Sequence, residues 1–429
     1  MNYTPVIGLE IHSHLKVKTG MFCRCATDIY NTDPNTRTCP VCLGLPGALP
    51  VPNKEAIKKT HLIGVALNCE LKKESQFDRK NYFYPDLPKG YQISQYEHPL
   101  CGKGYLKIEG KKIGITRVHL EEDTGKSVHV GQETLLDFNK SGAALVEIVT
   151  DPDMTSVKEA VEFSKEIRKI LKYLNTSDAD MEKGQLRLEA NISLRKEVET
   201  ELPSYKVEVK NINSFKFLEK ALLYEIARQA EVLDSGKQPV QENRGWDEIR
   251  QKTQEQREKE EASDYRYFPE PDIPPMSFTD GYFSGIKKLL PELPLEKQSR
   301  YVKALGLSED FARIICEEPE LAELFEGATK TLPAKDVANK LVNNIALRSL
   351  TLEKLLEKLV ETDQKEILDE GELSTIIKKA LETEPKAVAD VKAGKENAVS
   401  FLMGKVMRER GGLDPQEVKK LIVKIINES

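Results

Sequence analysis

The sequence predicts an α+β fold in which a region of mixed strands and helices is followed by helices alone. Over roughly the first 290 residues, stretches that alternate apolar and polar side chains, as half-buried strands do, lie between stretches of helical periodicity. Beyond about Pro291 the composition shifts to Leu-, Lys- and Glu-rich segments with few aromatic residues, which indicates helices and a domain boundary. A second boundary falls near Thr362, so we expect domains at residues 1–290, 291–361 and 362–429.

Length and charge limit the classes of protein to consider. A chain of 429 residues can form roughly two to four domains, each with its own core. The net charge of −6 excludes a protein that binds nucleic acid through bulk positive charge, so any RNA contact must use a local patch or a partner. No apolar run approaches the length of a membrane span, and residues 1–7 lack a signal-peptide pattern. We therefore expect a soluble, cytoplasmic protein with no membrane contact.

The first predicted strand carries candidate ligands. Residues 9–15 alternate apolar positions with Glu10, His12 and His14, which places the carboxylate and both imidazoles on one face. A strand with a solvent-exposed polar side would show the same pattern. A glutamate and a histidine two residues apart are also a plausible pair of cation ligands, which keeps His12 among the candidates.

Four of the seven cysteines form two close pairs, Cys23 with Cys25 and Cys39 with Cys42, separated by thirteen residues. This spacing can close a tetrahedral shell of thiolates around zinc, and the residues between the pairs suit a loop. Four thiolates leave no open coordination position, so the zinc would be structural rather than catalytic. The pattern is typical of metal ligands in a reducing compartment rather than of a disulfide framework.

Two groups of acidic residues lie at positions that are not typical of a solvent-exposed surface. Residues 118–126 follow a strand-like run and place Glu121, Glu122 and Asp123 next to one another, around a predicted turn. Adjacent carboxylates raise one another's pKa unless a positive charge lies between them, and Mg²⁺ bridging to substrate phosphates is a usual occupant. An ordinary solvated turn is the alternative. Glu147 lies in an apolar run typical of a buried strand, and a buried carboxylate needs a cation or hydrogen-bond donors.

The remaining elements follow from periodicity and capping signals. Four helices are predicted, at residues 53–71, 156–174, 214–236 and the charge-dense 241–261. Ser156 and Glu159 form a capping box at the start of the second helix. Strands are predicted at residues 135–139 and 143–150, paired as a hairpin, and at residues 186–195 and 206–213. Arg187 and Glu189 share one face of their strand, as they also would on a solvent-exposed face.

Two loops combine aromatic side chains with cations. Residues 77–92 crowd arginine and lysine among tyrosines, a mixture that can stack a base or clamp phosphates, or can be a loop packed by its own rings. Repeated prolines in residues 263–275 exclude a helix or a central strand, so Arg266 is expected in a fixed irregular loop. The sequence has no complete P-loop and no G-x-G-x-x-G motif, so any use of ATP would not employ the standard phosphate cradles.

Several long motifs together resemble a single family. They are residues 8–12, the cysteine pairs followed by Gly44-Leu45-Pro46-Gly47, and residues 77–95, 119–123, 147–149, 209–215 and 264–275. On these motifs the chain resembles the B-subunit family of the aspartyl/glutamyl-tRNA(Asn/Gln) amidotransferases, the GatB type of the GatB/GatE family, over nearly all of residues 1–288. For this region the resemblance implies a cradle built on an antiparallel sheet with flanking helices.

The resemblance also implies an activity and partners. Enzymes of this family are ligases that form carbon–nitrogen bonds with glutamine as the amido donor. The B subunit uses ATP and Mg²⁺ to phosphorylate the side-chain carboxylate of Glu-tRNA(Gln), and often of Asp-tRNA(Asn). Ammonia released by the amidase, which is the A subunit, reaches it through a channel and displaces phosphate, and the heterotrimer is completed by the small C subunit. The sequence contains no amidase signature, so glutamine hydrolysis is expected in a partner protein.

Site residues carry over motif by motif. The resemblance implies Mg²⁺ ligands at Glu10, His12, Glu122 and Glu147, and a catalytic set of Glu121, Glu122, Glu147 and Glu189. It implies contacts to the nucleotide or the acceptor end at Arg79, Lys80, Lys89, Lys210 and Asn211. Glu189 and Leu188 stand where family members usually carry aspartate and cysteine, so the reach of that carboxylate differs here.

The C-terminal part departs from the family pattern. Residues 336–370 lack a block of helices that relatives usually have, whereas residues 362–429 resemble the family's YqeY-like tRNA-binding tail domain. The shortening bears on tRNA affinity more than on chemistry. A non-catalytic, zinc-stabilised RNA-binding or assembly protein is the alternative function, and the intact set of candidate metal ligands favours the enzyme. The archaeal E-subunit type is excluded, because it has a large inserted domain for which this chain has no room.

Overall fold

The computed structural model describes residues 3–29, 31–196, 198–199, 201–258, 265–363, 370–392, 396–409 and 415–428. It contains two compact units: residues 1–301 with 316–319, and residues 302–315 with 320–429. The first unit combines a large sheet with helices and the second is helical, which confirms the predicted α+β class.

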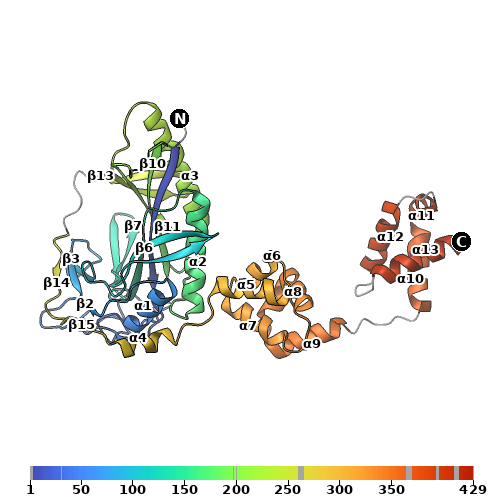
Figure 1. Ribbon diagram of the computed structural model, residues 1–429, viewed down its shortest axis with the longest axis horizontal. Helices are drawn as coiled ribbons and strands as arrows, with labels where there is room; N and C mark the ends of the chain where they lie inside the picture. The colour runs from blue at the N-terminus through green and yellow to red at the C-terminus, as the bar shows by residue number, and fades with distance from the viewer. Residues whose placement is uncertain are drawn as a thin grey trace. The chain divides into compact units, whose positions relative to one another are not determined.

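The first unit is built on an eight-stranded sheet of order β13-β12-β11-β10-β1-β9-β6-β5 (Figure 1). In that order the strands are Lys252–Glu258, Glu242–Asp247, Val207–Ile212, Leu186–Lys196, Tyr3–His14, Ala144–Thr150, Lys111–Glu122 and Gly104–Ile108. Neighbouring strands are antiparallel except β11 and β12, which are parallel. A parallel pair needs a crossover connection, and helix α3 (Phe215–Asp234) supplies it. The implied antiparallel sheet is therefore present, with one parallel pair.

Helices cover the apolar face of this sheet. Ile7, Leu9 and Ile11 of β1 are fully or almost fully buried, and they share one core cluster with residues of α1 (Lys54–Ala66) and α2 (Val157–Tyr173). Figure 1 shows α2 and α3 lying along the sheet. Because strand side chains alternate between faces, the polar residues of β1 lie on the opposite face of the sheet.

Three of the four predicted helix starts are confirmed by their caps. Ser156 accepts a hydrogen bond from the backbone N–H of Glu159, and the Glu159 carboxylate accepts one from the backbone N–H of Thr155, which completes a variant of the capping box. The side chains of Asn53 and Ser214 likewise accept backbone N–H groups in the first turns of α1 and α3. Such caps satisfy backbone N–H groups that have no partner inside the helix.

Three small sheets adjoin the large one. They are β14-β3-β4 (Phe268–Pro269, Asp78–Asn81, Tyr91–Ser94), β15-β2 (Met276–Ser277, Glu74–Ser75) and the hairpin β7-β8 (Lys126–Val130, Glu133–Asp137). The proline-rich loop is mostly irregular, as predicted, although its residues 263–264 lie outside the described part. Phe268 pairs with Arg79, which attaches this loop to the other aromatic loop. Helix α4 (Asp280–Lys287) follows it.

Three predictions about elements were wrong. The segment 143–150 does not pair with 135–139, because β9 lies between β1 and β6 in the sheet, whereas β8 pairs with β7. Residues 242–258 form the hairpin β12-β13 instead of a helix, since pairing with β11 overrides the helical propensity of the charged residues. The acidic stretch is not a turn at Glu121 and Glu122, because β6 continues through both residues.

From Pro294 onward the described residues form helices and their connections. The helices are α5 (Pro294–Leu305), α6 (Glu309–Ile315), α7 (Pro319–Ala328), α8 (Ala334–Asn343), η1 (Ile345–Ser349), α9 (Leu352–Asp363), α10 (Glu370–Thr383), α11 (Pro385–Lys392), α12 (Glu396–Glu409) and α13 (Pro415–Glu428). Helices α10 to α13 bury Ile377, Leu402 and Ile422 in a core of their own. The division into domains at residue 361 stays a prediction. Among the described residues, none of these or the earlier helices combines the length and apolar character that crossing a membrane requires.

Candidate active site

The polar face of the sheet gathers three of the candidate residues into one cluster. The pairing of β1, β9 and β6 places His12 opposite Glu147, and Glu147 opposite His119. The Nε2 atom of His12 lies 3.4 Å from Glu147 Oε2 and 3.6 Å from Glu121 Oε1. Glu121 and Glu147 are almost completely buried. We call His12, Glu121 and Glu147 the central cluster.

The charges of the central cluster are strongly coupled. Burial alone would raise the pKa of Glu147, but the imidazoles of His119 and His12 hold that pKa well below its usual range. Burial opposes the charged form of His12, yet the carboxylates of Glu147 and Glu121 outweigh it and raise the pKa of His12 to about 9. At neutral pH His12 therefore carries a positive charge between two carboxylates.

The central cluster has the composition of a divalent-cation site. One imidazole nitrogen and two carboxylate oxygens lie within 4.8 Å of one another and can hold a metal ion. Oxygen and imidazole ligands suit Mg²⁺ and Mn²⁺. His119 Nδ1 is buried without a hydrogen-bond partner in the described part of the chain, so this imidazole is held to Glu147 from one side only. The residues present fit a bound cation.

Glu10 and Glu189 belong to a second acidic group. Glu10 pairs in register with Glu189, and ligand atoms of both and of Glu208 lie within 4.8 Å of one another. Lys210 Nζ lies 3.0 Å from Glu189 and 3.1 Å from Glu208. Burial, followed by the charges of Glu147, Glu189 and Glu208, raises the pKa of Glu10. Glu208 was missed from the sequence, although its alternation with Lys210 in residues 206–213 was a usable signal.

Glu122 lies apart from the central cluster. Successive side chains of a strand point to opposite faces, so Glu121 and Glu122 of β6 separate. Glu122 forms an ion pair with Lys89 and accepts a hydrogen bond of 2.9 Å from the backbone N–H of Ile93. The structure therefore places Glu121, rather than Glu122, beside His12 and Glu147.

Asp123 contacts a lysine, an arginine and a histidine, and it was not among the predicted site residues. Its carboxylate oxygens lie 2.7 Å from His14 Nε2, 3.0 Å from Lys140 Nζ and 3.1 Å from Arg187 Nη2. Burial would raise the pKa of Asp123, but Arg187 and Lys140 hold it well below its usual range. Asp123 thereby fixes Arg187, whose backbone pairs with that of His12 in the sheet. In the sequence Asp123 directly follows Glu121 and Glu122, and nothing in the pattern shows that its role differs from theirs.

The five predicted nucleotide contacts lie in different parts of the site. Lys80 faces the central cluster: burial disfavours its charge, but the carboxylates of Glu121 and Glu147 and the ring of Tyr267 raise its pKa above the usual value. Arg79 donates to Glu270 at 2.7 Å and 2.9 Å and lies 4.1 Å from the centre of the Tyr91 ring.

The other three predicted nucleotide contacts lie elsewhere. Lys89 pairs with Glu122, and Lys210 pairs with Glu189 and Glu208. Asn211 is exposed next to Lys210. Lys80 alone of the five faces the central cluster in the described structure.

The four paired cysteines come together as predicted and can hold a metal ion. Their sulfur atoms lie within 4.8 Å of one another, and Cys39 Sγ is 3.8 Å from Cys42 Sγ. Sulfur atoms about 3.8 Å apart match the edge of a tetrahedron with Zn–S distances of about 2.3 Å. A hydrogen bond from the thiol of Cys23, helped by the backbone N–H of Cys39, lowers the pKa of Cys42 to about 5. The thiolate donor set thus fits structural zinc.

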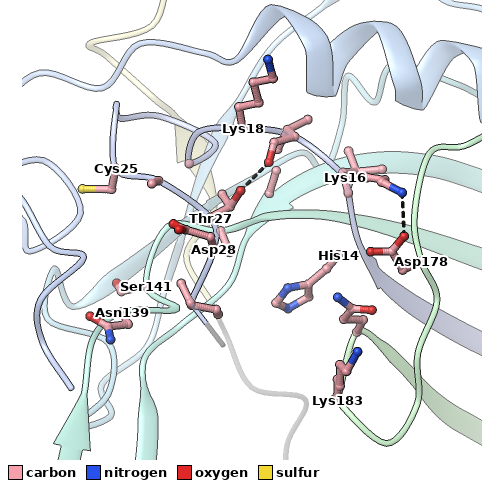
Figure 2. A pocket seen from close by; sticks show the side chains of 18 residues that line it. His14, Lys16, Lys18, Cys25, Thr27, Asp28, Asn139, Ser141, Asp178 and Lys183 are labelled. Atoms are coloured by element: carbon pink, nitrogen blue, oxygen red, sulfur yellow. Dashed lines mark hydrogen bonds and ion pairs between the residues drawn. The ribbon is translucent and has the colours of Figure 1, made fainter. Parts of the chain in front are cut away.

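A cavity of about 510 Å³ opens at the end of β1 (Figure 2). His14 lines it and contacts Asp123 at 2.7 Å, so the cavity lies beside the polar face of the sheet. Lys16 donates to Asp178 at 2.9 Å on its wall, and Cys25 and Ser141 bring it next to the cysteine loop. Its size is that of a small-ligand pocket.

Comparison with known protein families covers nearly the whole chain. Residues 5–284 match the model of the GatB/GatE catalytic domain, and residues 288–426 match that of the GatB domain. The chain belongs to the GatB/GatE family. The GatB/GatE catalytic domain thus covers the sheet, the central cluster, the cysteine loop and both aromatic loops.

Similar proteins extend this relationship over the whole chain. The chain is 44% identical to the B subunit of the aspartyl/glutamyl-tRNA(Asn/Gln) amidotransferase of Thermotoga neapolitana, over 99% of each chain. The corresponding protein of Thermotoga maritima is 44% identical and that of Brevibacillus brevis is 41% identical, each again over 99% of both chains. The Thermotoga alignments span 480 positions, more than the 429 residues here, so those relatives contain segments without a counterpart in this chain.

Proposed function

We propose that this chain is the B subunit of a glutamine-dependent tRNA amidotransferase. In this proposal it uses ATP and Mg²⁺ to phosphorylate the side-chain carboxylate of Glu-tRNA(Gln), of Asp-tRNA(Asn) or of both, and ammonia then converts the activated carboxylate into the amide. The names of the relatives support the overall reaction. The observation that carries the proposal is the central cluster, with His12, Glu121 and Glu147 in contact beside Lys80.

The arrangement suits the chemistry of such a reaction. A carboxylate is a poor acceptor for ammonia, and phosphorylation turns one of its oxygens into part of a leaving group. Phosphoryl transfer depends on positioning and on neutralising charge more than on covalent help from the protein. Mg²⁺, when bound, would neutralise phosphate oxygens. His12, Glu121 and Glu147 would hold it, while Lys80 places a fixed positive charge at the edge of the same cluster.

The proposal includes partners and a second metal. An amidase, the A subunit, would hydrolyse glutamine. This chain, the amidase and the small C subunit would together form a cytoplasmic heterotrimer. Structural zinc is assigned to the four paired cysteines, which lie within reach of one ion. The shortened region before the tail is expected to weaken tRNA binding and to leave the chemical step unchanged.

The test is amide formation by the reconstituted complex on Glu-tRNA(Gln) with ATP, Mg²⁺ and free ammonium, because ammonium bypasses the amidase. We expect Glu147→Gln to lower the rate at least 100-fold, since it removes a ligand and a charge from the central cluster. Glu133→Gln, which changes an exposed carboxylate on β8, serves as the matched control and should keep the native rate. An inactive native complex would favour the non-catalytic alternative, and an active Glu147→Gln complex would refute the site.

A further inference from the structure

Four tyrosines of the two aromatic loops and Tyr96, which follows β4, form a continuous row. Ser94 at the end of β4 donates a hydrogen bond of 3.3 Å to Glu121, which places the row beside the central cluster. In order the tyrosines are Tyr84, Tyr82, Tyr265, Tyr267 and Tyr96, with ring centres 6.1, 6.1, 6.0 and 4.4 Å apart. Tyr84 and Tyr96 at the two ends are half exposed, whereas the middle three are partly buried. We call these residues the tyrosine row. It joins segments that are far apart in the sequence, so the fold assembles it.

Positive charge lies against the tyrosine row. Lys80 Nζ is 4.9 Å from the centre of the Tyr265 ring and 5.8 Å from that of Tyr82. The guanidinium of Arg117 lies 5.9 Å from the centre of the Tyr96 ring. Aromatic faces interleaved with cations are the composition of surfaces that hold single-stranded nucleic acid.

Phe83, next to the tyrosine row, has a ring that is largely exposed to solvent. Its side chain is 86% exposed, and Gly90, where an added Cβ would lie 3.3 Å from the ring, leaves room beside it. Burial is what makes an aromatic ring stabilise a fold, so a ring this exposed contributes little to folding. Phe83 and Tyr84 together therefore present two adjacent rings whose faces are available to a ligand.

The loop that carries these rings is fixed to the site. The backbone N–H of Gly125 donates to the Asp86 carbonyl at 2.8 Å, and Lys89 of the same loop pairs with Glu122. Both anchors lie at the end of β6, within four residues of Glu121. The exposed rings are thus held at a set position relative to the central cluster.

We propose that Phe83, Tyr84 and the tyrosine row stack the unpaired bases at the end of the RNA substrate and so present its esterified amino acid to the central cluster. This inference rests on the proposed function. Every base has a face that can stack, and unpaired ends are where RNA is read by aromatic side chains. A free nucleotide needs a pocket that encloses most of its surface, whereas rings this exposed cover one face only. A base tethered to an RNA held elsewhere gains from its high effective concentration.

The first experiment measures binding by the complete complex, with two RNA hairpins as probes. One hairpin ends in four unpaired nucleotides and the other has a blunt end. The native complex should bind the overhanging hairpin about tenfold more tightly, which is roughly the effect of one stacked base. The double variant Phe83→Ala/Tyr84→Ala should lose this preference, and the ring-preserving Phe83→Tyr/Tyr84→Phe should retain it. Equal binding of both hairpins by the native complex would overturn the inference, as would an unchanged preference in the alanine variant.

The second experiment separates this inference from the proposed function. In the ammonium-dependent assay, the alanine variant should raise the KM for aminoacyl-tRNA about tenfold and leave kcat and the KM for ATP unchanged. An increase in the KM for ATP alone would assign the rings to the nucleotide and overturn the inference, with the proposed function intact. Were the native complex inactive, the proposed function would fail on its own, and the hairpin preference would still decide whether the rings stack RNA.

Discussion

Glu121 and Glu122 are neighbours in sequence but belong to different electrostatic environments on opposite faces of β6. Glu121 Oε1 lies 3.6 Å from His12 Nε2, whereas Glu122 is paired with Lys89 and accepts the backbone N–H of Ile93. One carboxylate belongs to the central cluster, and the other connects the sheet to the loop of exposed rings. Equivalent substitutions at the two positions should therefore have different consequences.

Glu122→Gln should reduce stability more than Glu121→Gln does. The Lys89 and Glu122 side chains are only 6% and 3% exposed, so removing one charge leaves the other buried and unpaired, at a cost of about 3 kcal/mol. Denaturant unfolding of both variants measures the difference. The double variant Glu122→Gln/Lys89→Met should recover part of the loss, because it leaves no unpaired buried charge. Equal destabilisation by the two single variants would contradict this account of the pair.

Binding of Mn²⁺, used as a probe for the Mg²⁺ site, should strengthen as the pH rises. The pKa of His12 is raised to about 9, so below that pH a cation must displace the His12 proton before the imidazole can bind it. The apparent affinity should fall about tenfold per pH unit below 9, with about one proton released per ion. Calorimetry in buffers of different ionisation enthalpy gives both quantities. His12→Asn should abolish the slope, whereas His129→Asn, at an exposed position, should keep it.

Purified chain should contain about one zinc ion, bound by the four paired cysteines. Cys39→Ser should lower the zinc content to near zero, because three thiolates remain, while Cys69→Ser, outside the cluster, should leave it unchanged. Loss of zinc should also loosen residues 39–42, whose Cys42 carbonyl accepts a hydrogen bond from Ser141 beside the cavity. Elemental analysis and limited proteolysis test the two parts. Equal zinc in both variants would place the ion elsewhere.

Stability of the first unit should fall between about pH 6.5 and pH 4 because of His61. This side chain is completely buried among Phe278, Tyr282 and Phe283, and burial lowers its pKa to about 4. The unfolded chain binds the proton at about pH 6.5 and the folded chain only near pH 4, so acidification favours unfolding by up to about 3 kcal/mol. Urea unfolding at a series of pH values measures this. In His61→Gln the dependence over this window should be weaker, and an identical dependence would rule out His61 as its source.

Local patterns predicted the faces of the strands but not which strands meet. The alternation in residues 9–15 correctly placed Glu10 and His12 on one face, yet it could not show that β1 lies between β9 and β10. That order pairs His12 with Glu147 and Glu10 with Glu189. Glu10 and His12 are only two residues apart on β1, yet they belong to different acidic groups, because Glu189 comes from β10 and Glu147 from β9.

Other misjudgements have equally local causes. The charged residues 241–261 suit a helix by propensity, and the turn at Gln251 is made without glycine, with a φ of 51°, so no turn residue announced the hairpin. The adjacent acids looked like a turn because nothing in the sequence shows that Glu122 would find Lys89. The cysteine pairs were predictable, since their spacing alone determines that they can share an ion.

The position of β1 at the centre of the sheet has a consequence for synthesis of the chain. β1 leaves the ribosome well before the strands to which it bonds: the backbone N–H of Leu9 donates to Thr150 Oγ1, 141 residues later, and Ile7 pairs with Ile192. Translation of that interval takes on the order of ten seconds, during which an apolar strand remains unpaired. The nascent chain should therefore depend on chaperones until β9 and β10 emerge. His12 cannot meet Glu147 before then, so truncated products would carry no assembled central cluster.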